Sequence, residues 1–239
     1  MRSYPLSRVR LLVPLGLALI MSAVIFFFSA PLLTAHGRMA RCLLYFTSIP
    51  VTSNTFIEVF PHLPRVAAPE VPFPSHRANP ARTAILFAVS LIGLILIHRR
   101  IPLGRNFVVF LAILLCAAGG VILFSSTFNF DSAMYTKIWL RGEVLVWLIL
   151  PWMSAFVFIL VLPSIVRGIV WSLLLQAYVM VWSAVRLAFC LGTLHFTGVL
   201  YLPLLWFCLG VLFDLVCLVF FYSLALHDSL KRVEGERAS

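Results

Sequence analysis

Six long apolar runs dominate the chain and restrict it to a fold that is built in a lipid bilayer. An α-helix needs about 20 apolar residues to cross the hydrocarbon core. Because backbone polar groups find no water there, such runs fold as helices, which satisfy their own N–H and C=O groups. The runs lie near residues 11–33, 83–98, 107–125, 144–166, 169–191 and 199–226. We therefore predict an all-α fold, a polytopic transmembrane helical bundle with about six spans.

The composition also indicates a membrane protein. Apolar residues make up 62% of the 239 residues and charged residues only 11%, whereas soluble domains contain about 45–50% apolar residues. Once six spans are subtracted, only one sizeable stretch outside the membrane remains. We therefore expect residues 1–239 to form a single integral membrane domain, located in the inner (plasma) membrane of a bacterium.

The region 34–82 differs from the rest of the chain because it holds half of the 14 prolines. Proline removes a backbone donor and clashes with the preceding helical turn, so we expect the second half of this loop to be extended and to lie over the membrane surface. Residues 38–49 mix arginines with large apolar side chains, which favours a short interfacial helix. Residues 51–60 fit either a strand or irregular chain.

The basic residues predict the orientation, because cytoplasmic loops carry an excess of Lys and Arg. They precede the first run, separate the second from the third, and follow the sixth. The residues are Arg2, Arg8, Arg10, His98, Arg99, Arg100, Arg105, Lys231, Arg232 and Arg237. We expect both termini to be cytoplasmic and the proline-rich loop 34–82 to be outside. Because the formal charge of +10 is spread over these ends, we expect contact with membrane lipids and no binding of nucleic acid.

Three polar side chains interrupt the last two runs: Gln176, Arg186 and Asp214. A charge at the centre of a bilayer costs about 2.5–3.5 kcal/mol on insertion scales, so such residues indicate a functional site. If the fifth run starts at the inner face, Gln176 lies about 10 Å and Arg186 about 25 Å from that face, and Asp214 lies about 22 Å below the outer face. We therefore expect Gln176 and Asp214 to pair in the inner leaflet, and no ion pair between Arg186 and Asp214. The pair is either a helix clamp or part of a proton or ion path.

A second group of reactive side chains lies near the outer end of the fifth run. Arg186 and Cys190 are four residues apart and share a helical face, and His195 follows in the expected turn. A neighbouring cation favours the thiolate, which is the nucleophilic form of cysteine. Arg186, Cys190 and His195 are therefore the candidate catalytic residues of a thiol-dependent enzyme. The structural alternative is a snorkelling arginine, an apolar cysteine and a loop histidine.

No other motif predicts chemistry. The five cysteines lie mostly in apolar runs and do not form an even exported set, so we expect no disulfide framework. His36, His62 and His76 lack the spacing of metal ligands. Neither a phosphate-binding glycine loop nor a serine nucleophile elbow is present. We therefore expect no metal and no cofactor.

Residues 182–187, WSAVRL, followed by His195 in a polytopic chain, resemble the exosortase and archaeosortase membrane transpeptidases or the small membrane proteins associated with them. In that family a Cys, an Arg and a His, in this chain order, face the outside and process C-terminal sorting signals. The resemblance implies functional roles for Arg186 and His195. However, the cysteine motif of the family is absent, and Cys190 follows Arg186 instead of preceding it. These departures favour an accessory relative without catalytic function.

A stripe of small residues, Ala112, Cys116 and Gly120, recurs every four residues in the third run and would let another helix approach closely. With the proline-rich loop, this stripe offers contact surfaces for a membrane-protein partner. We therefore predict a multi-pass inner-membrane protein that acts as an accessory or partner-binding component of an envelope process such as protein export, sorting or polymer assembly. The alternatives are a thiol-dependent transpeptidase or protease of the exosortase type, and a small transporter that uses Gln176 and Asp214.

Overall fold

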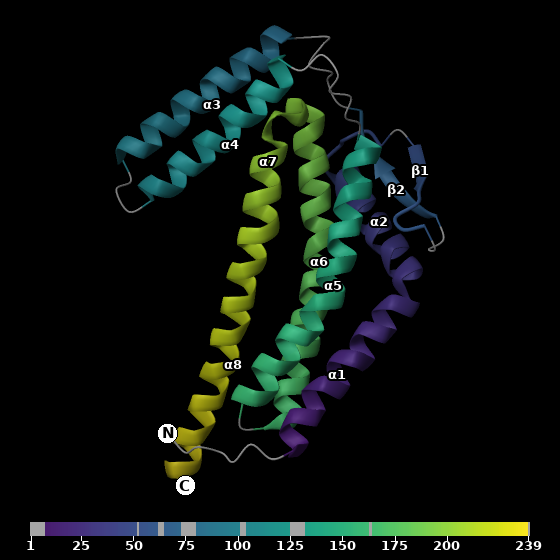
Figure 1. Ribbon diagram of the computed structural model, residues 1–239, viewed down its shortest axis with the longest axis vertical. Helices are drawn as coiled ribbons and strands as arrows, with labels where there is room; N and C mark the ends of the chain where they lie inside the picture. The colour runs from purple at the N-terminus through teal and green to yellow at the C-terminus, as the bar shows by residue number, and fades with distance from the viewer. Residues whose placement is uncertain are drawn as a thin grey trace.

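The computed structural model describes residues 8–51, 53–61, 65–72, 80–100, 104–124, 132–162 and 164–238. In these residues long helices surround a central pair, and a small β-hairpin lies at one end (Figure 1). The elements are α1 (Arg8–Phe27), α2 (Ser29–Phe46), β1 (Ser53–Ile57), β2 (Val66–Glu70), α3 (Pro80–Arg100), α4 (Arg105–Phe124), α5 (Ser132–Val161), α6 (Ile165–Thr197), the 3-10 turn η1 (Gly198–Tyr201), α7 (Leu202–Leu205), the π-helical turn η2 (Trp206–Leu212) and α8 (Phe213–Ala238).

The protein is a helical, multi-pass membrane protein by the length and composition of its helices. Four helical stretches among the described residues can cross a membrane, or five if the bent pair α1–α2 counts as one span. They are α3, residues 105–122, α5 and the 64-residue stretch Ile165–Asp228. The structure thus has four to five candidate spans instead of the six expected. Two features explain the difference: α1 and α2 are bent, and the last two expected spans belong to one helical stretch.

The first expected span, 11–33, is broken in its second half. α1 and α2 meet at an angle of 70°, and Phe28 at the junction has the non-helical angles φ −98° and ψ 14°. The Ser29 hydroxyl donates to the Phe26 carbonyl at 2.8 Å across this break. The short helix expected over 38–49 is therefore the second half of a longer helix, α2.

The proline-rich loop contains a β-hairpin, so the segment 51–60 includes a strand. β1 and β2 pair antiparallel, with Ser53 opposite Glu70. α2 lies close to β2, because a Cβ atom at Gly37 would be 2.7 Å from the Ala67 carbonyl oxygen. On the other side, Arg141 of α5 donates from Nε to the Val59 carbonyl at 2.5 Å. The hairpin is therefore attached to the bundle through both helices.

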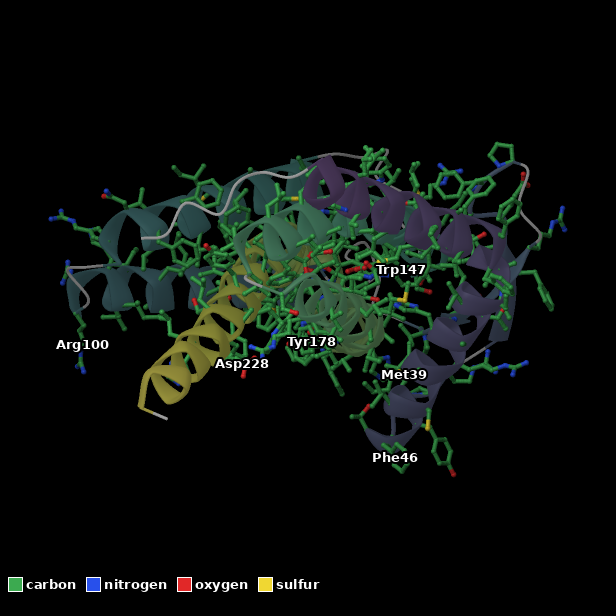
Figure 2. The ribbon with its side chains drawn as sticks, turned by 90° about the horizontal axis from the view of Figure 1, so that it is seen from below. Met39, Phe46, Arg100, Trp147, Tyr178 and Asp228 are labelled. Carbon is green, nitrogen blue, oxygen red and sulfur yellow. The ribbon has the colours of Figure 1, made fainter. Side chains whose placement is uncertain are left out.

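α5 is the central helix of the bundle and packs against α1 on one side and α6 on the other. α5 and α6 approach closely near their connection, where a Cβ atom at Gly168 would lie 2.8 Å from the Ile159 Cα. Figure 2 views the bundle from below and shows Trp147 and Tyr178 within this central group of helices. The indole of Trp147 is almost fully buried there.

The chain reverses direction after α6. Gly198, which ends this helix, has φ 69°, a conformation that glycine adopts without steric penalty. α7, η2 and α8 then run back beside α6 (Figure 1), so the stretch Ile165–Asp228 forms two antiparallel arms. α6 extends to Thr197, beyond the end at residue 191 that the apolar run predicts.

The hairpin of α3 and α4 stands to one side of the bundle (Figure 1). α4 contacts η1 and α7, and the two helices of the hairpin pack through Gly119, where a Cβ atom would lie 2.8 Å from the Phe87 ring. In the small-residue stripe, Cys116 is exposed and a Cβ atom at Gly120 would meet nothing within 4 Å. Ala112 and Cys116 line a hollow together with Leu94 and Ile95 of α3.

Candidate functional site

Arg186 is buried in the middle of α6, although its guanidinium carries a permanent charge. Its residue surface is 2% exposed. It belongs to the inward face of α6, together with Val179, Ser183 and Cys190, which are also buried. A buried charge is tolerated only where it is paired and hydrogen-bonded. The groups around Arg186 therefore define the candidate site.

The Arg186 guanidinium joins three helical segments. Nη2 donates to Glu143 Oε1 of α5 at 3.0 Å, and Nη1 donates to Asp214 Oδ1 of α8 at 2.6 Å. Nη1 also donates to the Leu209 carbonyl of η2 at 2.7 Å. The Trp139 ring of α5 lies 5.8 Å from Cζ, which is a cation–π distance. Arg186 thus holds α5, α6 and the returning arm together.

The π-helical turn η2 presents its backbone to this cation. π-helical turns are rare and recur at functional sites. Here the carbonyls of Leu209 and Gly210 lie 2.7 and 3.4 Å from Arg186 Nη1. Because a carbonyl oxygen has two lone pairs, it can accept from the guanidinium in addition to a backbone N–H. The charge is therefore shared by two carboxylates and two carbonyls.

A second buried polar contact lies one turn away and ties α2 to α6. The Ser183 hydroxyl donates to the Met180 carbonyl at 3.1 Å and lies 2.9 Å from His36 Nε2. While the hydroxyl donates to Met180, the His36 tautomer with its proton on Nε2 can donate in this contact. The His36 ring also packs edge-on against Trp147 at 5.6 Å between ring centroids.

The predicted pairing of Gln176 with Asp214 is wrong. Gln176 Nε2 donates to the Trp147 carbonyl of α5 at 3.3 Å. Asp214 instead forms the ion pair with Arg186 that the depth estimate argued against. Both polar residues of the expected pair thus hold helices together, but through different partners.

The depth estimate failed because it placed the turn between the two arms too early. α6 continues to Thr197, so Arg186 lies about 16 Å below the end of its helix. Asp214 lies about 18 Å beyond the start of α7 at Leu202 if the rise is α-helical, and the wider π-helical turn shortens that path. The two residues are therefore at similar depths.

The three candidate catalytic residues lie in two places. Arg186 and Cys190 share the buried face of α6, and the cysteine is 0% exposed. His195 is about 14 Å further along the helix axis, where its Nδ1 lies 2.5 Å from the Pro72 carbonyl oxygen. The described partners of the Arg186 guanidinium are carboxylates and carbonyls. A catalytic role of these three residues stays a prediction.

A groove of about 420 Å³ opens beside the Arg186 cluster, between α5, α6 and the returning arm. Its polar end is formed by Glu143 and Asp214, next to the indoles of Trp139 and Trp206. Along α5 it extends from Trp139 to Met153, which is about 21 Å of helix. The remaining walls are apolar apart from two glycines: Val146, Ile149, Leu150, Met153, Leu175, Val179, Leu215 and Leu218, with Gly142 and Gly210.

The polar end of the groove contains groups that the described residues do not satisfy. Glu143 Oε2 and Trp139 Nε1 are buried and have no hydrogen-bond partner in the described part of the chain. Ser183 lies beside the Glu143 carboxylate, but its proton is donated to the Met180 carbonyl. The site therefore offers one unused acceptor and one unused donor.

Sequence reasoning missed Glu143 because the apolar run was taken to begin at residue 144. α5 in fact begins at Ser132, which places Glu143 inside the helix. The signal was the spacing of Trp139, Glu143 and Trp147, which are four residues apart and therefore lie on one helical face. His36 was missed because it was assigned to the loop.

Among the described residues, no group of three or more His, Cys, Asp or Glu side chains could hold a metal ion. Comparisons with protein-family models, curated proteins and solved structures found no match to this chain. The resemblance of residues 182–187 to exosortases therefore has no support beyond those residues. The finding that stands is a multi-pass helical membrane protein with a buried charge cluster.

Replacing Arg186 by Met should destabilise the protein by about 3–5 kcal/mol, because it leaves Glu143 and Asp214 as unpaired charges. The triple variant Arg186→Met, Glu143→Gln, Asp214→Asn should be less destabilised, since it removes all three charges together. The measurement is the thermal unfolding midpoint in detergent micelles. An Arg186→Met protein as stable as the unmodified one would contradict the role of Arg186 in holding α5, α6 and the returning arm together.

Membrane-impermeant maleimide should not label a protein whose only cysteine is Cys190, because this side chain is fully buried. A protein that retains only the exposed Cys42 is the matched control and should react from outside in intact cells or oriented vesicles. Gel-shift labelling with and without denaturant measures both. Rapid labelling of Cys190 in the folded protein would contradict the observed packing and would support the hypothesis of a thiol-dependent enzyme.

Proposed function

We propose that the protein is a membrane-embedded binding component, which holds an amphipathic membrane molecule in the groove between α5, α6 and α8. In this way it would act as an accessory component of an envelope process such as protein export, sorting or polymer assembly. One observation carries the proposal: an apolar groove with an open side ends at two carboxylates, the buried Glu143 and the partly exposed Asp214. An occupant with an apolar tail and a polar head would meet matching surfaces at both ends.

The open side of the groove supports entry from the membrane. Ile149, Met153 and Leu215 line the groove and are 56%, 50% and 59% exposed. In a bilayer such apolar side chains face lipid tails, so a membrane molecule can enter the groove sideways. Burial of its apolar surface would add contacts without exposing the tail to water.

The surroundings of Arg186 and Cys190 support binding instead of covalent catalysis. The guanidinium is bonded to acceptors on three other helical segments, α5, η2 and α8, and the thiol is buried. Binding of a membrane-protein partner is supported at a separate place, where Cys116 is exposed and Gly120 has open space around it. Small residues at such a face allow close helix approach.

The proposed location is the inner membrane, with both termini in the cytoplasm. The start of α1 and the end of α8 lie at the same end of the bundle (Figure 1), as this orientation requires. The basic residues expected on the same side include Arg99, Arg100 and Arg105. Arg100 lies at the far end of α3, away from the central helices (Figure 2), and this end of α3 lies nearer the turn between α6 and α7 than the two termini (Figure 1).

A photoreactive amino acid in place of Met153 should cross-link a membrane molecule of defined mass. The adduct should survive detergent purification, because the molecule lies in a groove. Val181, which is 54% exposed and does not line the groove, is the control position and should give only heterogeneous or washable adducts. Intact-protein mass spectrometry distinguishes the two. The same adduct pattern at both positions would argue against a binding groove.

A small proton-coupled transporter is the second candidate, favoured by two carboxylates that share one buried guanidinium. In proteoliposomes with an internal pH dye, an imposed membrane potential should then drive proton flux. Asp214→Asn should abolish this flux, since an amide cannot carry the proton. An unmodified protein without flux, or an Asp214→Asn protein with normal flux, would reject the transporter.

A further inference from the structure

We propose that the groove selects a membrane amphiphile whose head group carries a primary ammonium. The inference rests on the proposed function, because it names the chemistry of the molecule held in the same groove. The head group would lie between Glu143, Asp214 and the two indoles, and its chains would run along α5 toward Met153. Four features of the site argue for this class of ligand.

The first feature is the charge balance. Two carboxylates, Glu143 and Asp214, face one guanidinium, that of Arg186. With both carboxylates ionised, the cluster has a surplus of one negative charge. The described residues that line the groove include no Lys, Arg or His. A cationic head group would therefore neutralise the surplus in surroundings where an uncompensated charge is costly.

The second feature is the unsatisfied oxygen. The Glu143 side chain is 6% exposed, and its Oε2 atom lacks a hydrogen-bond partner among the described residues. This oxygen accepts only from an N–H or O–H group. A primary ammonium has three N–H donors, whereas a quaternary ammonium has none. The site therefore distinguishes two head groups that carry the same charge.

The third feature is the aromatic wall beside the carboxylates. Trp139 and Trp206 both line the groove, and their rings meet edge to face at 5.8 Å between centroids. The faces of indole rings attract cations, with tryptophan the strongest of the aromatic residues. Trp139 already lies against the Arg186 guanidinium. An ammonium in the groove would meet the same kind of surface.

The fourth feature is the position of Glu143 along α5. After Glu143 this helix has no charged residue up to Val161, a length of about 27 Å, close to the hydrocarbon thickness of about 30 Å. Lys137 and Arg141 lie on the other side of Glu143. The carboxylate is thus at the level where lipid head groups begin, and the groove runs from there into the apolar layer.

The test uses phosphatidylethanolamine and phosphatidylcholine with identical acyl chains. Both are zwitterions, and only the first has N–H donors on its ammonium. The purified full-length protein in detergent is given an equal mixture, and the retained lipids are counted by native mass spectrometry. We expect phosphatidylethanolamine to be retained about tenfold more, as one charge-assisted hydrogen bond would produce. Phosphatidylglycerol, which is anionic, should be retained least.

The matched variants are Gly142→Leu and Gly93→Leu. Gly142 lines the groove, and a Cβ atom at either glycine would meet nothing within 4 Å. Both substitutions replace a helical glycine with a better helix former and leave the charge cluster intact. Gly142→Leu should fill the groove and reduce phosphatidylethanolamine retention to the level of phosphatidylcholine. Gly93→Leu, on α3, should leave retention unchanged.

The outcomes separate this inference from the proposed function. If both zwitterionic lipids are retained equally and Gly142→Leu displaces both, the groove binds lipid but the ammonium selection is wrong. Preferred retention of phosphatidylglycerol would also overturn the selection. If Gly142→Leu changes the retention of no lipid, the groove is not a lipid site, and the proposed function fails together with the inference.

Discussion

The guanidinium of Arg186 is the constraint on which the arrangement of the last three long helices depends. Arginine remains charged in proteins, so its burial in an apolar bundle requires acceptors from every side. α5 supplies Glu143, α8 supplies Asp214, and η2 supplies the Leu209 carbonyl. Each acceptor can reach Arg186 only if its own element is correctly placed. α5 must extend past its apolar run, and the returning arm must reach the depth of Arg186. Removing the guanidinium would therefore release three helices at once.

The helical class and the importance of Arg186 could be predicted from sequence, because both follow from apolar run length and the cost of burying charge. The ion-pair partner of Arg186 in the returning arm, Asp214, could not be predicted from sequence. The depth estimate took the residues after Leu191 for a turn, yet tertiary contacts keep them helical. Gly192 packs against Ile49, where a Cβ atom would lie 3.0 Å from its Cδ1, and His195 contacts Pro72. Run boundaries contain no information about such long-range contacts.

The sequence did not predict two other features of the site, the π-helical turn η2 and the position of Glu143, and the reasons differ. The π-helical turn η2 has the uniformly apolar sequence WFCLGVL, which does not distinguish a π-helix from an α-helix. Glu143 stands next to an apolar run, where a charge usually marks the end of a span. The same rule assigned it to the loop, although α5 extends about 16 Å further on that side. A charge at the edge of an apolar run therefore does not mark the end of the helix.

The charge stoichiometry of the cluster explains why a structural lock can also be a binding site. Joining α6 to one neighbour requires a single carboxylate, but joining it to both α5 and α8 requires two. With both carboxylates ionised, the cluster therefore has one surplus negative charge at the end of an apolar groove. Either a proton or a cationic head group could neutralise that charge. The transporter and the lipid-binding protein are therefore two alternative functions that the same charge cluster would allow. The unpartnered Glu143 Oε2 and the indoles beside it fit a ligand with N–H donors, and the apolar walls of the groove fit acyl chains.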